Sequence, residues 1–199
     1  MLTGKLLVQR FYCQVNFIEY DLNYIAMSSL FIACKVEESH RRIRDIINAF
    51  HRLRSPLPLG YISEEYIRSR AKLIETEMII LKALGFHVQP THAVLLLANY
   101  LRALDLSPKV GQLAINYLND CYYGPAPLFF ELPVQACAAI SLSLRAHRTN
   151  LPDGWWLVFD VEESALKECV TCFRRIERVE EKSLDRHGTS KRARPSEPF

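Results

Sequence analysis

A stretch of small and apolar residues with almost no polar face runs from Ile25 to Cys34 and ends abruptly in Lys35-Val36-Glu37-Glu38. A helix that is apolar all round belongs inside a bundle, where neighbouring helices cover it. The stretch is too short for a membrane span, which needs about 20 apolar residues. Its charged end must therefore emerge at the surface on a rigid element, which is a good place for a binding site.

The length and composition are those of a globular protein. A chain of 199 residues is long enough for one large domain or two small ones. Hydrophobic residues make up 49% of it, and the net charge of +3 is too small to imply that the whole chain binds nucleic acid. The six cysteines lie mostly in apolar helical stretches, which favours reduced thiols in a cytosolic or nuclear protein.

Every strongly periodic segment of the chain indicates a helix, and no convincing alternating strand pattern is present. One predicted helix begins after Ser63, a favourable N-cap that two glutamates follow in the first turn. Gly85 ends this helix, and Thr91 is the predicted N-cap of the next one. Four residues predict the apolar face of the first of these helices: Ile67, Ile74, Met78 and Leu81. The fold class that we predict is all-α.

The chain divides into two related parts, residues 1–86 and 87–181, because Gly85–Pro90 has the composition of a linker. The second part echoes the first: Ala26–Lys35 aligns without gaps with Ala136–Arg145. Both segments are helices of small and apolar residues that end on a cation. We therefore expect two helical domains, each built around one buried helix.

Residues 182–199 form a polar, aperiodic segment that we expect to be a disordered basic tail. It contains Lys191–Pro195, a candidate nuclear-import signal of a kind that also arises by chance.

The segment His40–Arg54 is rich in arginine, and Arg41, Arg42 and Arg44 form a candidate basic docking patch. Such a patch could bind phosphorylated or acidic partners, or RNA. In the alternative interpretation the arginines form a solvated helix face, and the apolar residues between them turn inward. Both interpretations remain open at this stage.

The sequence contains no phosphate-binding loop, nucleophile elbow or set of residues with the spacing of metal ligands, so we expect neither an enzyme nor a cofactor. Cys169 and Cys172 have the C-x-x-C spacing, but they lie within a helical pattern. We interpret them as packed helix residues rather than a metal or redox site.

Several motifs between Leu2 and Arg178 resemble the cyclin family, and cyclin L in particular: Thr3–Phe11, Lys35–Glu38, Arg41–Asn48, Glu77–Phe86, Ile115–Asp120 and Trp155–Phe159. The resemblance implies tandem five-helix cyclin folds. Met1 falls where the second cyclin-box helix would begin, so the first fold lacks its first helix. The Arg/Ser-rich tail of many cyclin L proteins is absent too, which is consistent with a divergent member, an isoform or an incomplete gene model.

The resemblance also implies a function: a nuclear regulatory subunit that binds and activates a cyclin-dependent serine/threonine kinase in RNA polymerase II transcription and pre-mRNA splicing. Lys35 matches the cyclin-box lysine that bonds to backbone carbonyls near the kinase C-helix. Glu77 matches the glutamate that accepts from backbone N–H groups there, and Glu38 completes the predicted kinase-binding set. From spacing alone, Lys35 and Glu38 would form a weak surface pair, and Glu77 would be an ordinary solvated side chain.

We therefore expect a heterodimer with a kinase, further contacts with the transcription or splicing machinery, and neither membrane association nor direct binding to nucleic acid. Two alternatives remain. One is a nucleic-acid-binding protein that resembles the cyclin-fold general transcription factor, and the other is a truncated chain that binds a kinase without activating it. The sequence does not identify the kinase or its substrate.

Overall fold

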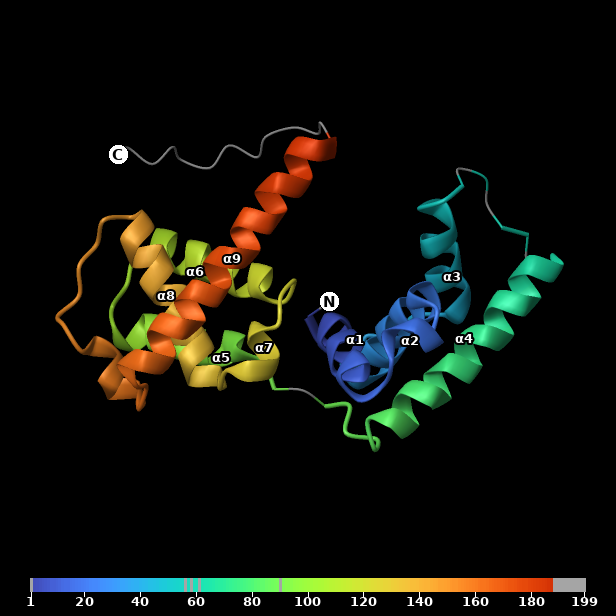
Figure 1. Ribbon diagram of the computed structural model, residues 1–199, viewed down its shortest axis with the longest axis horizontal. Coiled ribbons are helices and arrows are strands. Elements are labelled where there is room, and N and C mark those ends of the chain that lie inside the picture. The colour runs from blue at the N-terminus through green and yellow to red at the C-terminus, as the bar shows by residue number, and fades with distance from the viewer. Residues whose placement is uncertain (1, 56, 58, 61, 90, 188–199) are drawn as a thin grey trace. The chain divides into compact units, whose positions relative to one another are not determined.

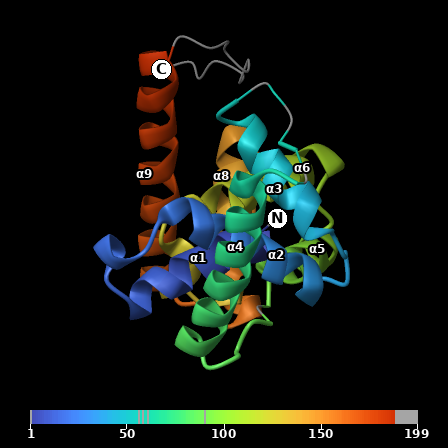
Figure 2. The same cartoon turned by 90° about the vertical axis from the view of Figure 1, so that its right-hand side faces the viewer.

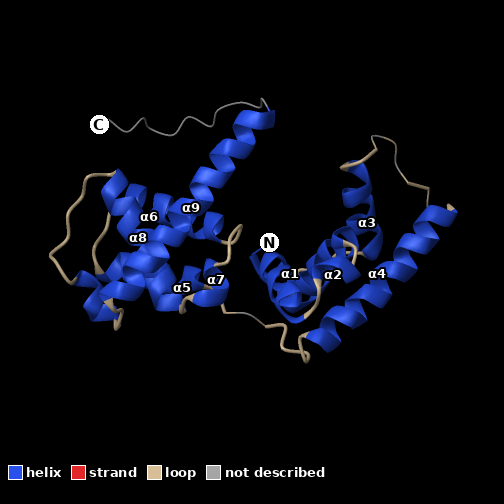
Figure 3. Ribbon diagram, viewed as in Figure 1, coloured by secondary structure: helices blue, strands red, loops and turns tan. Residues whose placement is uncertain are grey.

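The structure is a computed structural model that describes residues 2–187 except 56, 58, 61 and 90. All the regular secondary structure in these residues is helical, as Figure 3 shows, which confirms the predicted all-α class. The chain forms two compact units, Met1–Thr91 and His92–Phe199. The candidate nuclear-import signal Lys191–Pro195 lies outside the described residues.

The first unit is built around one buried helix, α2 (Figures 1 and 2). Its helices are α1 (Leu2–Gln14), α2 (Leu22–Val36), α3 (Ile43–Arg52) and α4 (Glu64–Ala83), with a short 3-10 turn η1 at Phe17–Glu19. Helix α2 packs against α1, α3 and α4. The sequence predicted this central position from the missing polar face of α2.

The core of this unit forms two clusters on the two sides of α2. Phe11, Ile25 and Ile80 belong to the cluster shared with α1 and α4, and Phe31 and Leu73 belong to the cluster shared with α3 and α4. Helix α1 packs closely on α2 at Gly4, where an added Cβ atom would lie in van der Waals contact with the Leu30 Cα of α2, at 3.6 Å. Ser28 and Ser29 of α2 are fully buried, and the Ser28 hydroxyl donates to the Leu73 carbonyl at 3.0 Å.

Helix α4 begins after Ser63 as predicted, and the Ser63 hydroxyl accepts from the Tyr66 backbone N–H at 3.2 Å. Its predicted apolar face was wrong at three of four positions; the fourth residue, Leu81, is partly buried and packs against the first core cluster. Ile67, Ile74 and Met78 are 58%, 43% and 47% exposed, and the face that packs on α2 carries instead Leu73, Thr76 and Ile80. Two apolar stripes run along α4. The buried stripe is the one that contains Leu73, whose carbonyl accepts the hydrogen bond from the Ser28 hydroxyl.

The predicted linker stays with the first unit as far as Val88. The Phe86 and His87 backbone N–H groups donate to the Leu81 and Leu84 carbonyls, and the Val88 side chain packs against the first core cluster. The boundary between the two compact units therefore falls between Thr91 and His92 along the chain, whereas the sequence placed it after residue 86.

The second unit is built around α8 in the same way (Figure 1). Its helices are α5 (Ala93–Ala103), α6 (Pro108–Cys121), α7 (Ala126–Phe129), α8 (Leu132–Ala146) and α9 (Glu163–His187), with a 3-10 turn η2 at Trp155–Phe159. Helix α8 packs against α5, α6 and α9, and its residues 134–140 are all buried.

Two details of the second unit differ from the sequence predictions. The N-cap of α5 is His92 rather than Thr91, and the His92 Nδ1 atom lies 2.9 Å from the hydroxyl of the buried Tyr122, which fixes this end of the helix. Helix α9 continues to His187, so it passes through residues 182–187, where the sequence pattern was expected to become aperiodic.

The cysteines differ strongly in burial. Cys137 of α8 and Cys169 of α9 are fully buried, whereas Cys13 of α1 is exposed. Burial raises the pKa of the Cys137 thiol to about 12. Burial, with smaller contributions from Cys172 and Cys137, also raises the pKa of Cys169 to about 12. Both members of the C-x-x-C pair lie on α9, where Cys169 is buried and Cys172 is partly buried.

Thiol alkylation of the native chain should follow this burial. We expect iodoacetamide at about pH 8 to modify Cys13 readily and to leave Cys137 and Cys169 unmodified, because the thiolate is the reactive form and burial suppresses it. Peptide mass spectrometry measures the modified fraction at each site. Denaturant should remove the protection, and fast alkylation of Cys169 in the native chain would contradict the burial of α8 and α9.

Candidate functional site

The packing of α4 on α2 brings together two of the residues predicted as a binding site. The Lys35 Nζ atom, in the last turn of α2, lies 2.5 Å from Oε1 of Glu77 on α4. The same ammonium group lies 4.2 Å from the centroid of the Phe31 ring, one turn earlier in α2. Because Phe31 is buried in the core, both contacts hold the Lys35 side chain in one position.

The ion pair remains open to a partner. The Lys35 side chain is 47% exposed and the Glu77 side chain 13% exposed. An ammonium group has three N–H donors and a carboxylate has two acceptor oxygens, so each retains bonding capacity after the bond between them. A donor and an acceptor side by side can bind the C=O and N–H groups of a peptide backbone, whatever side chains that peptide carries.

The two glutamates that follow Lys35 differ in their surroundings. The Thr3 hydroxyl donates to Oε1 of Glu37 at 2.5 Å, which ties the start of α1 to the end of α2. Glu38 is exposed and has a φ of +52°, the left-handed conformation that often follows a helix. The Glu38 backbone N–H donates to the Lys35 carbonyl at 3.2 Å. Among the described residues, no hydrogen bond or ion pair joins the Glu38 and Lys35 side chains, so the structure does not place Glu38 in the charged pair.

Exposed apolar residues flank Glu77 on α4, and sequence reasoning missed them. Ile74 lies one turn before Glu77 and Met78 lies next to it, and both are exposed. Phe86, just beyond the end of α4, is 63% exposed with a φ of +62°. A charged pair beside exposed apolar side chains has the composition of a protein-protein interface. No sequence signal separated these residues from the core, because periodicity assigned Ile74 and Met78 to the buried face.

The three arginines of the candidate docking patch lie at the start of α3. Arg41 and Arg42 are exposed, and Arg44 is partly exposed with its Nε atom 3.4 Å from Oδ1 of Asp45. Ile46 and Ile47 turn inward and are buried. Cations at a helix N-terminus oppose the helix dipole, so these arginines do not stabilise α3. Their exposed position fits both a docking patch and a solvated helix face.

The described residues hold neither a metal-ligand cluster nor a membrane-spanning helix. These residues contain no group of three or more His, Cys, Asp or Glu side chains that could hold a metal ion. None of the helices in the described part of the chain is long and apolar enough to cross a membrane.

Known proteins resemble this sequence and share this arrangement of helices around a buried α2. Residues 2–89 match the family model for the cyclin N-terminal domain. The chain is 34% identical over 195 residues to Cyclin-L2 of Mus musculus, a match that covers 93% of this chain and 37% of the relative. It is 35% identical over 185 residues to Cyclin-L1 of Homo sapiens, covering 87% of this chain and 35% of the relative.

A solved structure has the same fold. A chain in the crystal structure of the yeast RNA Pol II CTD kinase CTDK-1 complex matches with a TM-score of 0.74 and 17% identity, over 99% of this chain and 71% of that chain. The protein is therefore a cyclin-fold protein. It belongs to the cyclin family and is similar to cyclin L, which confirms the resemblance seen in the sequence. It spans a little over a third of the length of the cyclin L relatives named above.

The ion pair should contribute little to the stability of the free chain. We expect Lys35→Ala or Glu77→Gln to lower the free energy of unfolding by no more than about 1 kcal/mol, because half-exposed ion pairs are worth about 0–1 kcal/mol. Ile80→Ala on the buried face of the same helix should lower it by about 2–5 kcal/mol. Urea denaturation followed by circular dichroism measures both. A large loss from Lys35→Ala would show that the pair is mainly structural.

Proposed function

We propose that this chain is a regulatory subunit that binds and activates a cyclin-dependent serine/threonine kinase. The observation that carries the proposal is the Lys35–Glu77 ion pair, because it combines a fixed donor and a fixed acceptor at the exposed end of a buried helix. A chain of this kind performs no phosphoryl transfer itself. It acts on the conformation of the kinase.

The chemistry of the pair restricts what it can bind. Backbone groups inside a helix are already hydrogen-bonded to one another, whereas the first N–H groups and the last C=O groups of a helix have no partner within it. Lys35 can therefore bind carbonyls, and Glu77 can bind N–H groups, at the end of a kinase helix or in the segment beside it. Ile74 and Met78 would bury apolar surface against the same partner.

The proposed target is the end of the kinase C-helix. In a protein kinase, a Lys–Glu ion pair that involves this helix must form before phosphoryl transfer proceeds. A chain that binds the C-helix more tightly in its active position shifts the kinase towards the active state by that difference in affinity.

The similarities favour a kinase of the transcription group. The relatives include cyclin L proteins, and the structural neighbour belongs to an RNA Pol II CTD kinase complex. We propose by this analogy that the chain acts in RNA polymerase II transcription and pre-mRNA splicing, in the nucleus. Glu38 is proposed as a further kinase contact, because its exposed position follows Lys35 directly.

Loss of the charged pair should abolish kinase binding. Lys35→Ala combined with Glu77→Ala should weaken binding at least about 30-fold and eliminate activation, because truncating one partner of a buried charged contact costs about 2–5 kcal/mol. The measurement is a pull-down of the chain against a panel of nuclear cyclin-dependent kinases, with activity assayed on each complex.

The matched control is a second ion pair on the same helix. The Lys72 Nζ and Glu75 Oε2 atoms lie 3.1 Å apart, and both side chains are exposed. Lys72→Ala with Glu75→Ala should leave kinase activation unchanged. Full activation by the Lys35/Glu77 double variant would refute the proposed clamp. Binding by the wild-type chain without activation would favour the competitor alternative.

The arginine patch is proposed as a docking surface for an acidic or phosphorylated partner. Arg41→Gln with Arg42→Gln should retain kinase activation on a neutral peptide and reduce phosphorylation of a substrate that already carries phosphoserine by about tenfold. The control is Arg52→Gln with Arg54→Gln. Both arginines are exposed at the opposite end of α3, with Arg52 in its last turn and Arg54 just beyond it. Equal rates on both substrates would contradict the patch. Salt-dependent DNA binding lost in the first variant would favour the transcription-factor alternative.

A further inference from the structure

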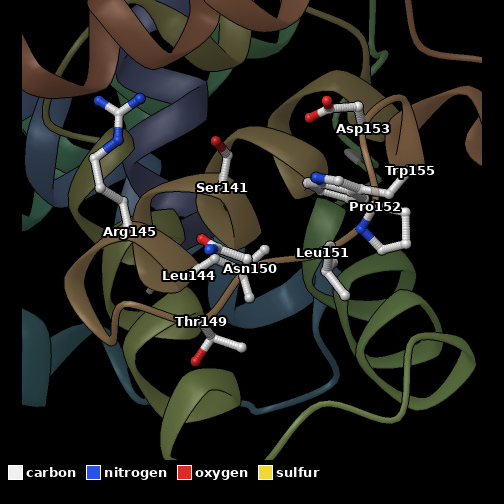
Figure 4. Close-up of a pocket in the computed structure, with 9 residues that line it drawn as sticks. All are labelled: Ser141, Leu144, Arg145, Thr149, Asn150, Leu151, Pro152, Asp153 and Trp155. Atoms are coloured by element: carbon white, nitrogen blue, oxygen red, sulfur yellow. The ribbon is translucent and has the colours of Figure 1, made fainter.

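The second unit contains a cavity that the proposed kinase contact does not use (Figure 4). Its volume is about 690 Å³, and it lies between the end of α8 and the segment that leads to η2. All the residues that line it fall between Ser141 and Trp155, so the second unit forms it alone. Its polar and aromatic lining residues are Ser141, Arg145, Thr149, Asn150, Asp153 and Trp155.

The cavity is open to solvent, and the segment that borders it is held at both ends by backbone hydrogen bonds. After α8, the Thr149 N–H donates to the Leu144 carbonyl at 3.0 Å, in a turn where Arg148 has a φ of +52°. Before η2, Gly154 has a φ of +78°, and the Leu157 N–H donates to the Gly154 carbonyl at 2.9 Å. The walls of the cavity are therefore formed before any ligand arrives, which reduces the entropy lost on binding.

One wall is an aromatic side chain with a fixed orientation. The Trp155 ring packs edge to face against Trp156 and Phe159, with centroid distances of 5.9 Å and 6.4 Å. The Phe159 ring in turn stacks on Tyr100 of α5 at 3.8 Å. Trp155 is only partly buried by these contacts. It therefore offers a rigid apolar surface to a ligand.

The polar side chains in the cavity are available for bonding. Within the described residues, no hydrogen bond or ion pair involves the side chains of Ser141, Arg145, Thr149, Asn150 or Asp153. The guanidinium of Arg145 has five N–H donors in a planar fork that matches a carboxylate or a phosphate. In Figure 4, Arg145 lies at one side of the cavity and Asp153 and Trp155 at the other, with Ser141 and Asn150 between them.

The two units differ in what surrounds the cation at the end of the central helix. Arg145 of α8 occupies the position that Lys35 occupies in α2, according to the ungapped alignment of the two helices. Lys35 is neutralised by Glu77 of α4. In the part of the second unit that the structure describes, Arg145 has no such carboxylate and faces the cavity instead.

We propose that this cavity binds a short acidic or phosphorylated segment of a partner protein. The carboxylate or phosphate of the segment binds Arg145, and a proline or another apolar residue packs on Trp155. Asp153 accepts a hydrogen bond from the backbone of the segment and disfavours a second anionic group at its end of the cavity. A nucleic acid would need several cations along its backbone, whereas this cavity offers one cation and one anion. The proposal does not depend on the kinase contact.

The test uses the full chain and fluorescein-labelled octapeptides. Each peptide carries glutamate, phosphoserine or glutamine at one position, with a proline placed one, two or three residues after it. We expect saturable binding, by fluorescence anisotropy, of the glutamate or phosphoserine peptides and at least tenfold weaker binding of the glutamine peptide, because charge-assisted hydrogen bonds are the stronger ones. The ratio between the first two distinguishes a carboxylate from a phosphate ligand.

Matched variants locate the site. Arg145→Gln should weaken binding about tenfold, whereas Arg148→Gln, which removes the same charge from a residue outside the cavity lining, should leave it unchanged. Trp155→Leu should weaken binding of the proline peptides, and thermal denaturation checks that this variant folds. Equal binding by wild type and Arg145→Gln, equal binding of the glutamine peptide, or no saturable binding of any peptide would overturn the proposal.

Discussion

The burial of α2 is the constraint on which the first unit depends. This helix has no polar face to give to solvent, so α1, α3 and α4 must pack around it. The small residues along α2 allow that packing, and the hydrogen bond from Ser28 to the Leu73 carbonyl places α4 against it. Lys35 and Glu77 are far apart in sequence and meet only because of this packing. The candidate kinase-binding site is thus a consequence of how the core is assembled.

The second unit is also built around a buried helix, but the cation at the C-terminus of that helix has different surroundings. Helix α8 is buried as α2 is, and the hydroxyl of Ser143 donates to the Val110 carbonyl of α6 at 2.6 Å. Both central helices end on a cation. In the first unit a carboxylate from a neighbouring helix pairs with that cation, whereas in the second unit the cation faces a cavity. The same architecture can therefore present two unlike binding surfaces, because only residues at the helix ends and in the following segments differ.

The sequence was sufficient for the fold class, the two central helices and the N-cap Ser63, because these depend on local patterns. Family resemblance supplied Lys35 and Glu77, but neither spacing nor resemblance predicted that the two bond to each other in the free chain. The prediction of which face of α4 is buried was largely wrong, because α4 has two apolar stripes and periodicity does not say which one packs on α2. The cavity beside Arg145 had no sequence signal, since it depends on the path of the segment between α8 and η2.

The ion pair would also lower the entropy cost of the proposed binding to a kinase. An exposed lysine loses up to about 2 kcal/mol of side-chain entropy when a partner fixes it. In this chain Glu77 and the Phe31 ring already restrain Lys35 in the free state, so most of that loss occurs on folding. The pair is half-exposed and contributes little net stability, so little free energy is lost when a partner also bonds to Lys35 and Glu77. A partner therefore meets a donor and an acceptor that are already oriented, and more of the interaction energy remains as affinity.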